Sequence, residues 1–190
     1  VTGITISKEQ AALARQRCEG LPVEILLEDY RDLEGRFDRI VSIGMFEHVG
    51  HRNYRTYFDT VDSLLADDGL FVLHTIGSNN SEISADPWIN KYIFPNGILP
   101  SIKHIAQASE GRLLMEDWQN FGADYDRTLM AWNENFDAHW HEVADNYNER
   151  TRRMFRYYLG VCAGAFRARD IQLWQVVYSK GRAGRYDSPR

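Results

Sequence analysis

The stretch VTGITISKEQAALARQRCEGLPVEILLED, residues 1–29, is the most informative part of the sequence for the fold, because one helical segment separates two apolar segments. Residues 1–6 alternate apolar and small side chains and predict a β-strand, and residues 23–27 predict a second one. Between them, Ser7 and Gln10 match the Ser-x-x-Gln form of a capping box, which predicts a helix from there to about Glu19. A strand, a helix and a strand in this order are typical of a parallel α/β sheet.

The next stretch repeats this pattern. Residues 37–43 predict a strand that ends at Gly44, and Asp68-Gly69 predicts a turn into a buried strand at residues 70–75. The helix between them is predicted from apolar side chains at helical spacing, which are Tyr54, Tyr57, Phe58, Val61, Leu64 and Leu65. Two such units predict an α/β fold with an open parallel sheet.

After Gly77 the alternation stops. Residues 77–97 carry Ser, Asn and Pro among aromatic side chains and predict a long functional loop or lid. Further on we expect a helix at residues 100–108, a strand at 113–121, helices at 125–141 and 149–168, and a last strand at 171–179. The polar end from residue 182 to 190 is predicted to be a flexible tail behind one domain of residues 1–181.

Composition excludes several classes of protein. The chain has 190 residues, of which 44% are hydrophobic, and a net charge of −5, so we expect one domain and no nucleic-acid partner. Since no run of about 18 apolar residues is present, no membrane-spanning helix is expected. Cys18 and Cys162 are far apart, which predicts neither a disulfide framework nor a metal site and fits a reducing cytoplasm. Because the chain begins at Val1 in a predicted strand, we expect it to be a piece of a longer protein.

The candidate site lies at the carboxyl ends of the predicted strands, where open α/β sheets bind ligands. Polar clusters follow four strands, at residues 5–10, 29–31, 44–50 and 74–77, and we expect them to face one crevice. Glu47 and His48 lie between two glycines, which let a backbone approach a ligand, although a surface turn explains them equally well. His74 is either a site residue or a core histidine bonded to a carbonyl group. Gln10 and Asp29 are either cofactor contacts or only caps.

Six longer motifs carry a resemblance to a known family. They are TISKEQ (residues 5–10), DYRDLEGRFDRIVSIGMFEHVG (29–50), LHTIGS (73–78), DPWINKYIFPNG (86–97), NFGADYDRTLMAW (120–132) and GAFRARDIQLWQVVYS (164–179). With them the chain, from residue 1 to about 180, resembles the cyclopropane-fatty-acyl-phospholipid synthases and, more distantly, the mycolic acid cyclopropane synthases.

This resemblance implies a class I methyltransferase fold, a Rossmann-like α/β sheet with a lid and helical insertions that binds S-adenosylmethionine (SAM). It implies methylene transfer from SAM to a cis double bond of an unsaturated phospholipid at the membrane surface, through a carbocation that bicarbonate deprotonates. The implied cofactor contacts, to the ribose and adenine of SAM, are Thr5, Ile6, Ser7, Gln10, Asp29 and Tyr30. The implied catalytic residues, around the bicarbonate, are Glu47, His74, the backbone of Ile76, Tyr125 and Cys162.

Alternatives stay open beside the resemblance. A related methyltransferase would leave a methyl branch, and a non-catalytic lipid-binding module would leave the lipid unchanged. Cys162 shares a helical face with Phe155, Leu159 and Phe166 and is otherwise a small core residue. We interpret the aromatic side chains of residues 86–95 as lid packing or substrate contacts, and Phe136, Trp140 and Tyr147 as core. The implied location is cytoplasmic, at the inner face of the membrane, although no basic amphipathic helix indicates it. A homodimer is left open.

One part of the family pattern is absent from the sequence. The family's first strand and its glycine-rich SAM loop have no counterpart here, and that strand would lie between the strands at 1–6 and 37–43. We therefore expect that residues 1–190 alone cannot form one continuous sheet with an intact SAM pocket. The chain would need the N-terminal segment of the same protein, a wrong strand pairing, or a strand from another copy.

Overall fold

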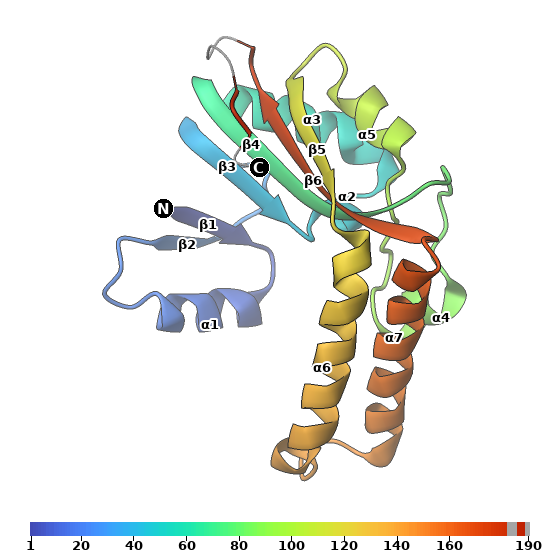
Figure 1. Cartoon of the computed structure of the whole chain (residues 1–190). Coiled ribbons are helices and arrows are strands. Elements are labelled where there is room, and N and C mark those ends of the chain that lie inside the picture. Colours follow the sequence, from blue (N-terminus) through green and yellow to red (C-terminus); the bar gives the residue numbers. More distant parts are fainter. Residues whose placement is uncertain (182–185, 189–190) are drawn as a thin grey trace.

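The computed structural model describes residues 1–181 and 186–188 and divides their strands between two sheets (Figure 1). The first sheet is the parallel pair β1 (Thr2–Thr5) and β2 (Glu24–Leu27), connected by α1 (Lys8–Arg17). The second has the order β3-β4-β6-β5, formed by β3 (Phe37–Ile43), β4 (Leu65–Ser78), β5 (Leu114–Asn120) and β6 (Ile171–Ser179). The predicted α/β class is confirmed.

The first strand–helix–strand unit forms as its sequence predicts. Thr2 pairs with Glu24 and Thr5 with Leu27, and the N–H of Gln10 donates to Ser7 Oγ at 3.2 Å, which begins α1. The capping box forms only on the serine side, because the Gln10 side chain accepts the Thr5 hydroxyl at 2.9 Å instead. Ser7 and Gln10 thus tie the helix start to the end of β1.

The second sheet is mixed. β3 and β4 are parallel, as the second unit predicts, whereas β6 is antiparallel to both β4 and β5. The predicted turn at Asp68-Gly69 is wrong, because both residues lie inside β4, where a register shift opposite Phe37 and Arg39 accommodates them.

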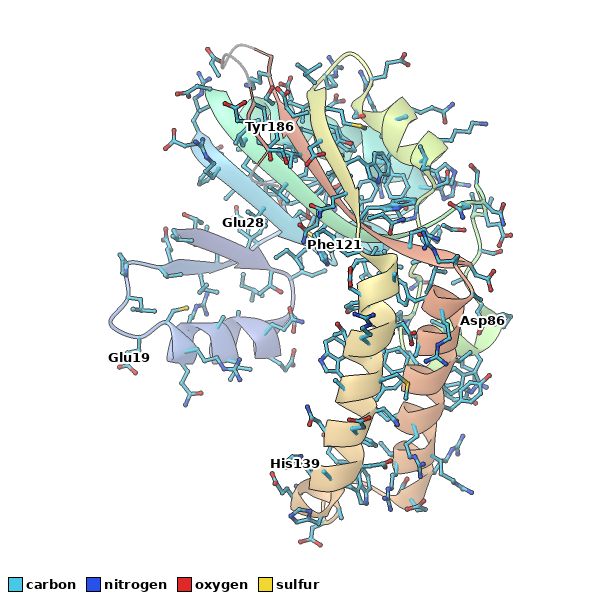
Figure 2. All side chains as sticks on the ribbon, viewed as in Figure 1. Glu19, Glu28, Asp86, Phe121, His139 and Tyr186 are labelled. Atoms are coloured by element: carbon cyan, nitrogen blue, oxygen red, sulfur yellow. The ribbon has the colours of Figure 1, made fainter. Side chains whose placement is uncertain are left out.

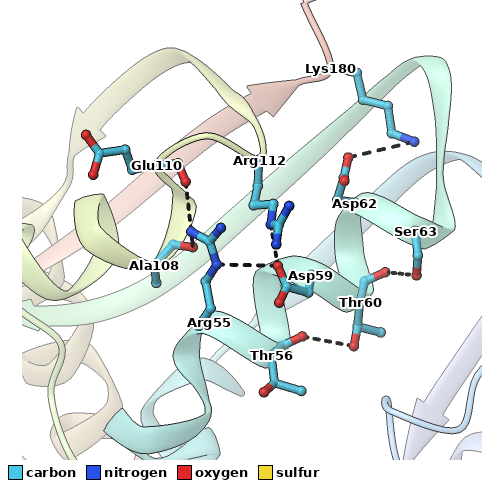
Figure 3. Close-up of polar contacts among 10 residues, drawn as sticks. All are labelled: Arg55, Thr56, Asp59, Thr60, Asp62, Ser63, Ala108, Glu110, Arg112 and Lys180. Carbon is cyan, nitrogen blue, oxygen red and sulfur yellow. Dashed lines mark hydrogen bonds and ion pairs between the residues drawn. The ribbon is translucent and has the colours of Figure 1, made fainter.

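Helices cover one face of this sheet. α3 (Tyr54–Leu64) and α5 (Ile102–Ser109) contact each other there, after the short α2 (Phe46–Val49) and the 3-10 turn η1 (His51–Asn53). Arg112 Nε lies 2.5 Å and Arg55 Nε 3.4 Å from the same carboxylate oxygen of Asp59, and Arg55 also donates to the carbonyl of Glu110 at 2.8 Å (Figure 3). Because these groups are exposed, they orient α3 against α5 more than they stabilise it. The core beneath is aromatic, with Phe46, Tyr57, Phe58, Phe71 and Tyr178.

A long helical hairpin extends from one end of the sheet. α6 (Gly122–Val143) begins next to Phe121 and continues past His139, and α7 (Glu149–Arg167) returns beside it (Figure 2). A second apolar cluster of Leu129, Leu159, Ala163, Phe166 and Leu173 holds the hairpin to β6. The predicted loop at residues 77–97 contains one short helix, α4 (Pro87–Tyr92), which lies against α7. Within the described part of the chain, no helix has the length and apolarity needed to cross a membrane.

The two sheets are not joined. Among the described residues, no strand pairs with the second edge of β1 or with the free edge of β3. Beside this gap, on β3, Ile43 is 69% exposed. The expectation that the chain does not form one continuous sheet is confirmed, and no wrong pairing of the described strands closes the gap. Of the predicted tail, residues 182–185 and 189–190 lie outside the described residues, while Ser188 donates to Asp117 at 3.3 Å.

Candidate functional site

A cavity of about 730 Å³ opens where β4 ends, between the loop after β3, the segment around α4, and the hairpin α6–α7. Apolar and aromatic side chains form most of its wall, among them Leu99, Leu129, Val161 and Phe166. Four of the five predicted catalytic residues also line it, namely Glu47, Ile76, Tyr125 and Cys162. Residues from four separate segments therefore meet in one largely apolar pocket, which is the usual form of a small-molecule site.

Glu47 is the buried charge of this cavity. Its side chain comes from α2, the residue is only 7% exposed, and Oε1 accepts the backbone N–H of Ile76 at 2.7 Å. No described residue forms a hydrogen bond with its second oxygen, Oε2, although that atom is buried. Burial raises the pKa of Glu47, and the N–H of Ile76 opposes the rise. The carboxyl group therefore holds a proton more readily than usual, and one of its two oxygens lacks a hydrogen-bond partner among the described residues.

Tyr125 and Cys162 form the helical side of the site. Tyr125, in the first turn of α6, packs edge-on against Phe166, with 5.0 Å between ring centroids. Burial raises its pKa, as do the nearby groups of Glu47 and Cys162. Burial also raises the pKa of the Cys162 thiol to about 11. Both side chains are thus neutral near pH 7, so Tyr125 can donate a hydrogen bond and Cys162 is not an activated thiolate.

His74 is not among the residues that line the cavity. It lies two residues before Ile76 on β4, hence on the same face of the strand, and its Nδ1 is 3.1 Å from Nε2 of Gln175. Since the amide nitrogen can only donate, Nδ1 accepts, and the neutral ring carries its proton on Nε2. Burial lowers the pKa of His74. The predicted catalytic role of His74 is left as a prediction.

The predicted cofactor residues lie at the end of the other sheet. Because β1 and β2 are parallel, residues 5–10 and 29–31 lie at the same end of this sheet, the carboxyl end of its strands. Asp29 accepts Nε and Nη2 of Arg31 at 2.8 and 2.7 Å, and these hydrogen bonds lower its pKa to about 2. Thr5 and Gln10 bond to each other, and the side chain of Ile6 is exposed. Together these residues form a polar cluster at the carboxyl ends of β1 and β2, which we call the polar rim. None of them lines the cavity.

Aromatic contacts connect this rim to the cavity. Tyr30 packs edge-on against Tyr57 at 5.5 Å between centroids, and Tyr57 packs against Phe46 at 5.0 Å. Phe46 directly precedes Glu47 in the chain. The loop after β2 is thereby anchored to the core under Glu47, although the four polar clusters do not share one crevice in this structure. The carboxyl ends of the two sheets are apart, because no described strand joins β1 to β3.

Several lining residues were not predicted as site residues from the sequence. Tyr157, Tyr158 and Val161 line the cavity together with Cys162, so α7 contributes several residues to the wall and not Cys162 alone. Their spacing on the predicted helix was the available signal. Trp88 and Phe94 line the cavity and also pack against Tyr157 and Tyr158 of α7, so both interpretations of residues 86–95, lid packing and substrate contacts, stay open. Tyr147 was interpreted as core, and this is wrong, because it lies in the loop that connects α6 to α7 and is 56% exposed.

Comparisons with known proteins relate the sequence and the fold of this chain to one family. A sequence profile of the family "Mycolic acid cyclopropane synthetase" matches residues 1–176. The chain is 67% identical over 181 residues to a cyclopropane-fatty-acyl-phospholipid synthase of Escherichia coli, covering 95% of this chain and 47% of that protein. It is 40% identical over 202 residues to a probable fatty acid methyltransferase of Pseudomonas putida, covering 100% and 51%. The solved structure of the mycolic acid cyclopropane synthase CmaA1, complexed with SAH and CTAB, has a TM-score of 0.86 at 30% identity, covering 95% of this chain and 70% of that one. The chain thus spans about half the length of the curated relatives it matches.

Proposed function

This chain belongs to the mycolic acid cyclopropane synthetase family, and we propose that the full-length protein converts cis double bonds of phospholipid acyl chains to cyclopropane rings, with SAM as the methylene donor. The observation that carries the proposal is the buried carboxyl group of Glu47, which lines a largely apolar cavity large enough for an acyl chain and whose Oε2 has no hydrogen-bond partner among the described residues. The 67% identity to the Escherichia coli enzyme supports the same substrate class.

The apolar cavity suits the first step of this chemistry. The π electrons of the double bond form a bond to the sulfonium methyl carbon of SAM, and the carbon–sulfur bond breaks with its electron pair leaving on sulfur. The acyl chain then carries a positive charge on the other alkene carbon. Aromatic faces such as those of Tyr125, Trp88 and Phe94 stabilise a nearby cation and keep water out.

The residues around Glu47 fit a small oxyanion such as bicarbonate. Two anions repel each other, but the raised pKa of Glu47 lets its carboxyl group share a proton, and the neutral Tyr125 phenol can donate a hydrogen bond. Bicarbonate would supply the base that removes a proton from the new methyl group before ring closure. The N–H of Ile76 orients Glu47 rather than facing the cavity, because it already donates to Oε1. His74 and Cys162 complete the proposed set.

The proposed SAM contacts are Thr5, Ile6, Ser7, Gln10, Asp29 and Tyr30. The ionised Asp29 and the side chain of Gln10 are hydrogen-bond acceptors suited to ribose hydroxyl groups. The aromatic packing of Tyr30 on Tyr57 would hold that end of the cofactor site at a defined place beside Glu47.

A methyl-branched product is the second candidate, and the 40% identity to a probable fatty acid methyltransferase favours it. Mass alone does not distinguish the two, because the carbocation can instead lose a proton from the chain, and the resulting methyl-branched alkene has the same composition as the cyclopropane. The position of the methylene protons in a proton NMR spectrum separates them, since cyclopropane protons are strongly shielded.

The test is an incubation of the full-length protein with labelled SAM and an unsaturated phospholipid, followed by mass spectrometry and NMR. We expect acyl chains that gain one methylene group and show cyclopropane protons. The same incubation with a fully saturated phospholipid is the control and should give no product. If the unsaturated chains gain no mass, the proposal is wrong.

A further inference from the structure

Glu47 lies on a helix that is too short to hold it in place. α2 has four residues, and no described side chain caps its first turn. A single helical turn is unstable in water, because it fixes several dihedral angles for one hydrogen bond. The position of the Glu47 carboxyl group therefore depends on contacts with other segments, and the hydrogen bond from the N–H of Ile76 is one of them.

Residues 97–99 provide a second contact, on the backbone of Glu47. The N–H of Ile98 donates to the carbonyl oxygen of Glu47 at 2.8 Å. Gly97 and Leu99, on either side of Ile98, line the cavity together with Glu47. The hydrogen bond from Ile98 thus ties two parts of the cavity wall to each other.

Tyr54, the first residue of α3, contacts the segments on both sides of this hydrogen bond. Its hydroxyl group donates to the carbonyl oxygen of Ile98 at 3.3 Å. Its ring stacks on the ring of Phe46, the residue before Glu47, with 4.1 Å between the centroids and 18° between the planes. Tyr54 is only 3% exposed and is not among the residues that line the cavity. It therefore acts on a ligand in the cavity only through its neighbours.

The hydroxyl group of Tyr54 is a hydrogen-bond donor and not an anion. Burial raises the pKa of Tyr54, and the nearby carboxyl group of Glu47 raises it further. A buried tyrosine needs an acceptor in any fold, so the hydrogen bond to Ile98 alone would be an ordinary packing contact. Tyr54 differs from such a case because its acceptor and its stacking partner both adjoin Glu47, one through a hydrogen bond and the other through a peptide bond.

We propose that Tyr54 is a positioning residue for the reaction, which holds Glu47 in place from two sides, an inference that rests on the proposed function. Without the hydroxyl group the ring still stacks on Phe46, but residues 97–99 lose their hydrogen bond to α3. The carboxyl group of Glu47 then occupies a wider range of positions, and a displacement of about 1 Å at a reacting group costs up to about 100-fold in rate. The proposed SAM contacts lie at the end of the other sheet, so the affinity for SAM stays the same.

The first experiment compares Tyr54→Phe with Tyr178→Phe in the full-length protein. Tyr178→Phe is the matched control, because it removes a buried hydroxyl group from the same core, on β6. With unsaturated phospholipid, we expect kcat to fall about ten-fold for Tyr54→Phe with the KM for SAM within about two-fold, and the control to keep both values within about two-fold. Wild-type kcat in a folded Tyr54→Phe, or an equal loss in the control, would overturn the proposal.

A double variant separates positioning from general stability. If Tyr54 acts through Glu47, adding Tyr54→Phe to Glu47→Gln should lower kcat by less than about two-fold, because the group to be positioned is already lost. The same ten-fold loss in both backgrounds would mean that the hydroxyl group serves only the fold, and the proposal would be wrong.

The second experiment does not depend on activity. Hydrogen exchange of the Ile98 amide is measured in the full-length protein, and we expect it to be protected in the wild type and about five-fold faster in Tyr54→Phe, but unchanged in Tyr178→Phe. Exchange in the wild type as fast as in an unstructured peptide would overturn the proposal, even if Tyr54→Phe does not fold. If the wild type forms no product, the proposed function fails, while the exchange rates still test whether Tyr54 holds residues 97–99.

Discussion

Glu47 Oε1 accepts the backbone N–H of Ile76 at 2.7 Å and thereby joins α2 to the end of β4. The hydrogen bond fixes one oxygen of a carboxyl group that lines the cavity, while the other oxygen, Oε2, is buried without a partner among the described residues. An unsatisfied buried carboxylate oxygen costs stability, roughly 1–3 kcal/mol or more. Such a cost is typical of groups that serve a ligand rather than the fold.

Replacing Glu47 by Gln should reduce turnover of the full-length protein by about two orders of magnitude or more, the usual effect of losing a group that acts on a proton in the transition state. Gln still accepts the N–H of Ile76, so the fold and the affinity for SAM should change little. Initial rates and isothermal titration with SAM measure the two effects. Equal losses in turnover and SAM affinity would place Glu47 in the cofactor site instead.

Replacing His74 by Ala should also lower turnover much more than SAM affinity, because the ring is proposed to orient the base. The matched control is Gln175→Leu, which keeps the imidazole and removes only its hydrogen bond at 3.1 Å. We expect a smaller loss for the control. If both variants lose the same activity, His74 acts only by holding the strand pair β4–β6 in place.

The pH dependence of stability should reveal the buried carboxyl group. Burial raises the pKa of Glu47 above its ordinary value of 4.5, so the folded state binds this proton more tightly than the unfolded state. The resulting stabilisation is complete below pH 4.5 and is lost as pH rises through the raised value. The wild type should therefore lose stability relative to Glu47→Gln between about pH 4.5 and neutral pH. Thermal unfolding of both proteins across this range measures the difference, and a constant difference in Tm would contradict the shift.

Gly77 should not tolerate a side chain. A Cβ atom at this position would lie 2.0 Å from the ring of Trp174. Trp174 is a buried residue of β6, the strand between β4 and β5. We expect Gly77→Ala to lower the free energy of unfolding by about 1–3 kcal/mol, measured by urea denaturation. Gly160→Ala is the control, since a Cβ there meets no atom within 4 Å and alanine favours the helix by about 1 kcal/mol. A neutral Gly77→Ala would mean that the ring of Trp174 can move aside.

The open edges of β1 and β3 predict how the isolated chain behaves. Residues 1–190 alone should bind SAM much more weakly than the full-length protein, because the polar rim after β1 and β2 shares no cavity with Glu47. The unpaired edges should also promote association. Titration with SAM and analytical ultracentrifugation test both statements, with Val41→Lys on the exposed face of β3 as the variant that should reduce association. A monomer with full SAM affinity would contradict this account.

Local sequence patterns predicted most of the secondary structure. The strand at residues 37–43 and the strand at 171–179 have the predicted bounds, and Ser7 begins the predicted helix. These features depend on side chains that are neighbours in the chain, since apolar periodicity and helix capping act over a few residues. Glu47 and His74 were indicated by their place after predicted strands, whereas Tyr125 and Cys162 came only from the resemblance, because a single tyrosine or cysteine carries no signal of its role.

Long-range contacts account for what the sequence did not predict. The direction of β6, the inclusion of Asp68 and Gly69 in β4, and the exposure of Tyr147 all depend on how distant segments pack. The same holds for the meeting of α4 with α7, where the rings of Trp88 and Tyr157 lie 4.5 Å apart between centroids, because a packing contact depends on distance in space and not on separation along the chain.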